Sequence, residues 1–496
     1  MRICKFSAFI LLVIALLSPG ISASGFENSQ LGIKAGGMSG AFRAIADDWT
    51  AAYYNPAGYA YIYDNQLGGN LALVHYRNEL TPNYEWPGGS GWTQPGIFNG
   101  STIYNFHEIL SNPAGGFVVR MPVWGETVFG FSVYQPYDYN VTWKLYENVD
   151  AYNNLVTMPG DQFRNNLDVV AFQLTAGREF MEEKLSLGLG VQVLRVDLLF
   201  NDIIFRDNPF WDNLPSQYQT TFTKKITQWA NNDGYGFGLG LRAGALWKVN
   251  EKVNLALTAS LPFDVNVSGN TSLKFHMPNV PLLNSDSLPV ANPGQPANLF
   301  LTGTEVIDSA DFETEVDLPP AIGAGMAYTV NDKLRIGVDA EYTFWSDYDG
   351  LFFEFTNHQG LPTSADTSDI ARTFLTSDIS SPVDWKDAFK FMVGASYNLS
   401  GVLTMVGGTS FDQSPCRGSN QITPQFVDTG DKFGLTGGLI FHIQQWDLGL
   451  ATSYIGYSDL TVDKLVDLDG DGNMDSFSGD YKADTYETIL SFNYRF

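Results

Sequence analysis

A short acidic stretch, DLDGDGNMD at residues 467–475, has residue types and spacing that could bind a cation. Carboxylates stand at positions 1, 3 and 5 of a calcium loop, and a glycine, a backbone carbonyl and a further carboxylate follow at positions 6, 7 and 9. Position 12 is Ser478, where a bidentate glutamate is usual. The pattern predicts a weak, structural calcium site formed by Asp467, Asp469, Asp471, Asn473 and Asp475. The alternative is an acidic, solvated turn.

A second group of residues could bind an apolar ligand. In the segment 206–233, Phe210 and Trp211 are followed by Phe222, Ile226 and Trp229, spaced as one face of a short helix. Apolar ligands bind in concave apolar surfaces, so these side chains predict a ligand-capture surface in a loop. Alternatively, they pack loops together or lie at the membrane interface.

A ligand that carries a carboxylate would also need a cation. If the alternating segments described below are strands, four cations lie on their small and polar face: Arg242, Arg335, Lys390 and Arg495. Arg335 shares its face with Asp339 and Glu341, which favours an internal salt bridge. Contact between Arg335 and a ligand carboxylate is the alternative.

The sequence predicts neither a catalytic site nor a required cofactor. A hydrolase would need a serine, a histidine and an orienting polar partner. None of the five histidines (His75, His107, His276, His358 and His442) lies in a hydrolase motif.

The beginning of the chain predicts export. Arg2 and Lys5 precede an apolar run at residues 6–17, and small residues follow, so residues 1–23 are predicted to be a signal peptide. Its removal would leave Cys416 as the sole cysteine, which excludes an internal disulfide.

The composition favours a membrane barrel over other classes. Aromatic residues make up 14% of the chain, and after the leader no window is apolar for long enough to form a membrane-spanning helix. The net charge of -26 argues against nucleic acid as a partner, because phosphate binding needs clustered Lys and Arg.

Alternating segments follow residue 65. In residues 185–193 the odd positions are Leu or Val and the even positions are Ser, Gly or Gln; residues 237–247 and 334–344 repeat the alternation. A period of two predicts β-strands, and short turns alternate with long loops, as in outer-membrane barrels. We predict an all-β, antiparallel transmembrane barrel over residues 66–496 with fourteen strands: 66–80, 115–122, 126–140, 168–180, 184–205, 234–249, 252–269, 320–330, 333–350, 387–399, 402–414, 431–444, 446–463 and 483–496.

Residues 24–65 do not alternate and are rich in Gly and Ala. A barrel of about fourteen strands encloses a lumen too wide for its wall side chains to fill, so it conducts water or is plugged. Residues 24–65 are therefore predicted to be a hatch inside the lumen.

Several segments resemble the FadL/OmpP1/TodX family of outer-membrane channels for long-chain fatty acids and other hydrophobic compounds. They are GAFRAIADD with NPAG in the predicted hatch, LPPAIGAGMAY at 318–328, LRIGVDAEYTFWSD at 334–347, the segment 385–415, and the closing SFNYRF. The resemblance implies that Asn55, Pro56 and Ala57 lie beside a sideways opening made by a kink in the third strand. In this chain Pro136 lies within that predicted strand, and proline in a sheet is confined to edges and bulges.

The resemblance implies a monomeric, passive channel in the outer membrane of a Gram-negative-type bacterium, surrounded by lipid and lipopolysaccharide. Its ligands would be hydrophobic small molecules such as fatty acids or hydrocarbons. Two alternatives remain: a secretion or structural partner of the PorV type, and an open aqueous porin.

Overall fold

A computed structural model describes most of the chain. The described residues are 25–27, 31–83, 97–105, 109–121, 127–147, 158–181, 184–213, 216, 219, 224–278, 299–300, 303–362, 369–416, 423–426, 430–463, 465–470 and 475–496. The predicted leader lies outside these residues, as do Phe222, Asp471 and Asn473 of the predicted sites. Within them, no helix is both long and apolar enough to cross a membrane.

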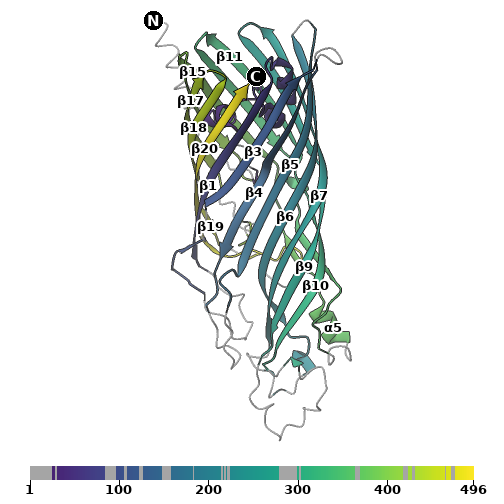
Figure 1. Cartoon of the computed structure of the whole chain (residues 1–496). Helices are drawn as coiled ribbons and strands as arrows, with labels where there is room; N and C mark the ends of the chain where they lie inside the picture. The colour runs from purple at the N-terminus through teal and green to yellow at the C-terminus, as the bar shows by residue number, and fades with distance from the viewer. Residues whose placement is uncertain are drawn as a thin grey trace.

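Among the described residues, fourteen antiparallel strands close into a barrel (Figure 1). Strand β1 pairs with both β3 and the last strand, β20, which closes the wall. The predicted fold class is thus confirmed. The wall strands are β1 (Gln66–Pro82), β3 (Ile109–Arg120), β4 (Val128–Trp143), β5 (Phe163–Phe180), β6 (Leu185–Asp207), β7 (Lys225–Asn250), β8 (Val253–Pro262), β11 (Ala321–Asn331), β12 (Leu334–Thr343), β15 (Ala388–Ser400), β16 (Leu403–Asp412), β17 (Lys432–Ile443), β18 (Trp446–Tyr457) and β20 (Gly479–Arg495).

The apolar face of the alternating segments points outward. In β6 the side chains of Leu187, Leu189 and Val191 are exposed, whereas Ser186 and Gln192 are buried inside. This is the arrangement of a barrel that presents its apolar side to lipid and its polar side to the lumen. The C-terminus lies at one end of the barrel, near the short strand-to-strand turns, which we name the turn end (Figure 1).

The opposite end, named the loop end, carries structure that the sequence did not predict. Predicted strand 252–269 is two strands, β8 and β9 (Val265–His276), while β10 (Glu305–Val316), β13 (Gly350–Thr356) and β14 (Ile379–Pro382) lie where loops were expected. Strand β9 pairs with β7 and with β10, so the sheet continues beyond the barrel. The prediction of a loop at residues 305–316 was wrong. Strand β10 does alternate, but its outward residues are mostly polar, whereas those of the wall strands are apolar.

The other elements at the loop end are short. They are β2 (Ile103–Tyr104), β19 (Leu460–Val462), η2 (Trp211–Asn213), η4 (Trp345–Asp347) and helix α5 (Asp369–Leu375).

The segment from Leu31 to Asn65 lies inside the barrel near the turn end, as α2 (Ile33–Gly37), α3 (Ala51–Tyr54) and η1 (Pro56–Tyr61). Almost all of its residues are buried. Wall glycines make room for it: a Cβ added at Gly337 would lie 2.4 Å from the Ala41 carbonyl oxygen, and one at Gly188 would lie 2.2 Å from the Pro56 carbonyl carbon. The small inward residues of the wall therefore make room for this segment. Residues Leu31 to Asn65 are called the hatch below, and Gly25–Glu27 is described separately.

Candidate functional site in the barrel lumen

A buried arginine attaches the hatch to the wall. The Arg43 guanidinium forms an ion pair with Glu341 and lies 3.7 Å from Asp339. The backbone N–H groups of Phe42 and Arg43 also donate to Asp339 Oδ2, at 2.9 and 2.8 Å. The internal salt bridge predicted for Arg335 therefore does not involve Asp339 or Glu341, because a hatch residue occupies both carboxylates.

Arg335 instead lies beside the hatch. Its Nη1 is 3.5 Å from the Asp47 Oδ2, and Lys34 pairs with the same carboxylate at 2.6 Å. Nothing in this arrangement tests whether Arg335 contacts a ligand carboxylate, so that role stays a prediction.

The segment Gly25–Glu27 enters the lumen and lies along β4. The Asp138 N–H donates to the Phe26 carbonyl at 3.1 Å, and Glu27 forms a β-bridge with Tyr137. The Phe26 ring lies among Tyr137, Trp345, Tyr348 and Trp385, with ring centroids 4.8 to 5.9 Å away.

The Glu27 side chain holds this segment to the opposite part of the wall. It lies 3.4 Å from Lys390 Nζ and accepts a 2.8 Å hydrogen bond from the Tyr53 hydroxyl. Lys390 also lies 3.4 Å from Asp412, so its charge is shared between two carboxylates. Lys390 faces the lumen, as the strand parity predicts.

The wall is irregular between β3 and β4. Their ladder joins Gly115–Arg120 to Val128–Val133, and the β4–β5 register shifts between Tyr134 and Tyr137, at the position of Pro136. Residues 109–114 of β3 pair only with β1 among the described strands. We name this unpaired stretch between β3 and β4 the seam.

The seam is closed by side chains. Asn112 Nδ2 donates to Asp138 Oδ2 across it at 2.7 Å. On its lumen side, a space of only about 10 Å³ remains between Leu31 and Tyr53 of the hatch and the wall residues Asn112 and Gln135. A volume of this size holds about one water molecule, so the hatch blocks the seam from inside.

A larger cavity of about 90 Å³ lies between the Gly25–Glu27 segment and the wall. Phe26, Tyr76 and Tyr139 contribute apolar surface. The charged side chains of the lining are Lys390 and Lys432 and four carboxyl groups, those of Glu27, Asp138, Asp412 and Glu487. Lys432 Nζ donates to the Gly25 carbonyl at 3.3 Å. Lys432 was missed from the sequence, although the alternation of residues 432–443 places it opposite the outward Phe433. The cavity can accept a small group with an apolar body, and its polar wall carries both signs of charge.

Asn55, Pro56 and Ala57 lie against β6 and β7. Asn55 Nδ2 donates to the carbonyls of Arg43 at 2.9 Å and Ala245 at 3.3 Å, and Ser186 Oγ donates to the Ala57 carbonyl at 2.9 Å. These residues are not among those that line the space behind the seam, so the structure does not place them beside it.

The predicted aromatic surface is divided by the structure. Phe210 is buried and packs against Phe300 at 5.0 Å, and Trp211 lies in η2 under the Lys224 ammonium at 5.6 Å. Ile226 and Trp229 belong to β7, so the predicted helical spacing is wrong. Ile226 faces inward, whereas Trp229 shares the outward row of Tyr235.

Three of the five predicted calcium ligands lie together. Carboxylate oxygens of Asp467, Asp469 and Asp475 are all within 4.8 Å of one another. The Gly470 N–H donates to Asp467 Oδ1 and the Leu468 N–H donates to Asp475 Oδ2, both at 2.6 Å. In the described residues of this stretch, backbone N–H groups thus bond to two of the clustered carboxylates.

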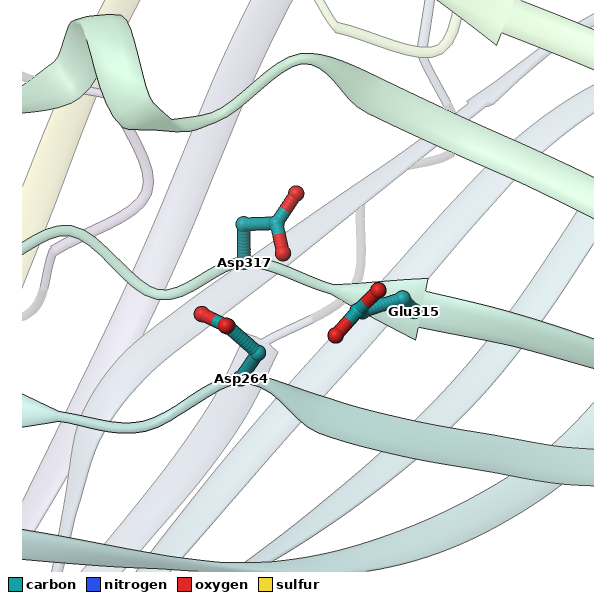
Figure 2. A group of neighbouring side chains, drawn as sticks. All are labelled: Asp264, Glu315 and Asp317. Atoms are coloured by element: carbon teal, nitrogen blue, oxygen red, sulfur yellow. The ribbon is translucent and has the colours of Figure 1, made fainter.

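A second acidic group, not predicted from sequence, lies where β8 gives way to β9 and β10 to β11. Figure 2 shows Asp264, Glu315 and Asp317 projecting into one space from two neighbouring segments, with carboxylate oxygens within 4.8 Å of one another. Burial and the charge of Asp264 raise the pKa of Asp317 to about 6. Such a group could hold a cation.

Comparisons with known proteins agree with this architecture. The family model described as outer membrane protein transport protein (OMPP1/FadL/TodX) matches residues 14–496. The crystal structure of a Pseudomonas aeruginosa FadL homologue has a TM-score of 0.71 at 17% identity and covers 95% of this chain and 99% of that one.

Two further structures have the same fold. The Pseudomonas putida toluene transporter TodX gives a TM-score of 0.62 at 14% identity, over 95% of this chain and 100% of that one. The Ralstonia pickettii toluene transporter TbuX gives 0.60 at 14%, over 94% and 99%. No curated protein sequence matches the chain.

Proposed function

This chain belongs to the OmpP1/FadL/TodX family of outer-membrane transport proteins, and we propose that it passively admits apolar molecules such as long-chain fatty acids or hydrocarbons. The observation that carries the proposal is a seam in the wall, bridged by the hydrogen bond from Asn112 to Asp138 and covered from inside by the hatch. An aqueous pore would not need such a seam, whereas an apolar molecule that leaves sideways enters the lipid directly.

The cavity beside Phe26 supports the first part of the route. The Phe26 side chain is apolar and packs against four aromatic rings, so an apolar ligand can replace it without breaking a hydrogen bond of that side chain. If the ligand has a carboxylate, Lys432 is the proposed cation for it, because Lys390 is already shared by Glu27 and Asp412; Arg335 is the further candidate.

Displacement of Phe26 would also release the Glu27 contact to Lys390. The hatch residues Leu31 and Tyr53 could then move from the seam, and the ligand would pass out between β3 and β4. The concentration gradient drives the movement, and no side chain is given a catalytic role.

Entry would occur at the loop end. Phe210, Trp211 and Phe222 are the proposed capture residues, and Trp229 is left out of this surface because it faces outward. The names of the two toluene transporters support a hydrocarbon as ligand, while the two lumen lysines support a fatty acid.

Ligand retention tests the proposal. Purified protein is offered oleate and hexadecane, and the retained molecule is identified by native mass spectrometry with lipid extraction. We expect each wild-type barrel to retain one molecule of oleate or of hexadecane. The Lys432→Met variant should lose oleate but keep hexadecane. The turn-end control Lys184→Met should keep both. A folded barrel that retains neither molecule would contradict the proposal and favour a PorV-like partner.

We also propose that the loop 467–475 binds calcium in a structural role. The clustered carboxylates of Asp467, Asp469 and Asp475 support this, and Ser380 Oγ donates to Asp469, so the loop would be fixed to its neighbour. Calcium should raise the thermal midpoint of the wild type but not of Asp467→Asn, while the exposed control Asp463→Asn should respond like the wild type. Equal midpoints with calcium and with chelator in the wild type would refute the site.

Three further features complete the proposal. The leader at residues 1–23 is removed on export, the barrel works as a monomer, and lipid and lipopolysaccharide surround it.

A further inference from the structure

A polar hollow lies on the outer wall at the loop end, where β7, β9 and β10 continue the sheet (Figure 1). Its volume is about 380 Å³, within the range of small-molecule sites. All but one of the residues that line it carry amide, hydroxyl or carboxylate groups, the exception being Ala310; the others are Asn231, Asp233, Asn270, Thr271, Ser272, Ser309, Asp311 and Gln359.

The strand register aligns these residues in two parallel rows. Asn231 is opposite Ser272, and Ser272 is opposite Ser309, whose carbonyl accepts a 2.9 Å bond from the Gln359 N–H. In the next row Asp233 is opposite Asn270, and Asn270 is opposite Asp311.

Asp311 is the last residue of the second row. Its carboxylate accepts a 2.7 Å hydrogen bond from Asn357 Nδ2, which fixes its position. Neighbouring strands lie about 4.8 Å apart, so each row offers a series of hydrogen-bonding groups at about that spacing.

The hollow continues directly from the lipid-facing surface. Leu239, Phe237 and Tyr235 are successive outward residues of β7 with exposed fractions of 57%, 60% and 56%. Asp233 and Asn231 are the next two outward residues in the same row. The hollow therefore begins where the apolar band ends, at the level of the outer-leaflet head groups.

Charge argues for a neutral ligand rather than a phosphate. The outward cations nearest along these strands are already paired: Lys274 lies 3.3 Å from Glu305, and Arg195 lies 2.6 Å from Asp197. The hollow itself contains Asp233 and Asp311, which repel anions. Amides and hydroxyls donate to sugar hydroxyls and accept from them, and carboxylates accept from them. The exposed Tyr235 ring lies beside the hollow, with the Arg195 guanidinium 5.6 Å from its centroid.

We propose that this hollow binds neutral sugar residues of lipopolysaccharide in the outer leaflet. The inference depends on the outer-membrane location and on the register of β7, β9 and β10, and it is independent of the transport proposal. Its consequence is a barrel fixed in height and rotation relative to the glycolipid layer.

The test compares lipopolysaccharide that carries core sugars with lipid A alone, each bound to the purified full-length protein. The hollow variant is Asn270→Ala with Ser309→Ala. The matched control is Asn266→Ala with Ser268→Ala, which changes exposed residues of β9 outside the hollow. Folding is checked by the heat-dependent migration of the barrel in gels, and Asn231→Ala with Gln359→Ala replaces the hollow variant if it does not fold.

We expect the hollow variant to bind core-bearing lipopolysaccharide about tenfold to thirtyfold more weakly, the effect of two lost hydrogen bonds, with lipid A binding unchanged. The control should match the wild type. Equal weakening in the control, or equal affinity of the wild type for both glycolipids, would overturn the proposal. Loss of wild-type binding on chelation would also overturn it, because a cation held by Asp233 and Asp311 would then be the ligand.

Discussion

The hatch and the segment before it are attached to the wall by two different kinds of contact. Arg43 is held by charge and by directional bonds, with two carboxylates and two backbone N–H groups converging on one place. Phe26 is held by four aromatic rings, a contact without a preferred partner. An apolar ligand can compete with Phe26 but not with Arg43.

On the proposed route, this difference determines which part of the lumen contents would move. The hatch remains anchored on the β12 side through Arg43, while the Gly25–Glu27 segment can leave the β4 side, where the seam lies. Opening therefore needs local rearrangement near the seam and not expulsion of the whole hatch.

The largest effect should come from Arg43→Met. The variant leaves Asp339 and Glu341 buried without their cation, which costs about 4 kcal/mol in the free energy of unfolding. Urea unfolding of the refolded barrel measures this loss. Arg335→Met is the control and should lose less than about 1 kcal/mol, because that ion pair is longer and partly exposed. Similar losses in both variants would show that the ion pairs of Arg43 stabilise the barrel no more than the ion pair of Arg335 does.

A smaller and more local effect is expected from Phe26→Ala. Removing a buried phenyl ring costs about 3 kcal/mol, which corresponds to roughly a hundredfold increase in opening of the segment. Hydrogen exchange at the Asp138 amide, which donates to the Phe26 carbonyl, reports this opening. Exchange at the Phe42 amide, which donates to Asp339, should not change. If both amides exchange faster together, the hatch and the segment move as one unit.

The smallest effect concerns the acidic group Asp264, Glu315 and Asp317. No cation like the Arg43 guanidinium beside Asp339 is described next to this group. Burial and neighbouring carboxylates raise the pKa of Asp317 from 3.8 to about 6, so the folded state holds its proton more tightly than the unfolded state. Stability is therefore lost as the pH rises from about 4 to about 6. Asp317→Asn should raise the thermal midpoint at pH 7.5 and leave it unchanged at pH 4. An equal shift at both pH values would show that charge is not the cause.

The sequence predicted the wall better than its contents, for a physical reason. Lipid-facing alternation is a local pattern, so strands such as β6 can be read along the chain. Strand β10 was missed because it faces water and carries Glu305, Ser309 and Asp311 outward. Contacts between distant residues left no local signal, and so the pairing of Arg43 with Glu341 could not be predicted from spacing.

The same holds for the polar hollow. Asn231, Ser272 and Ser309 are adjacent only through strand register, although each is visible as a polar residue in the sequence. Pro136 is the opposite case, because proline disturbs a sheet wherever it stands and its own position indicated the irregularity in β4.

Closing the seam covalently tests the central claim most directly. Asn112→Cys with Asp138→Cys, in a Cys416→Ser background, is joined by a short cross-linker that reduction removes, in Gram-negative cells deprived of their own fatty-acid channel. The control pair is Val119→Cys with Phe129→Cys, within the hydrogen-bonded part of the same ladder. We predict that cross-linking stops oleate and toluene uptake through the seam variant, that reduction restores it, and that the control transports throughout. Unchanged uptake through a cross-linked seam would show that the ligand leaves by another route.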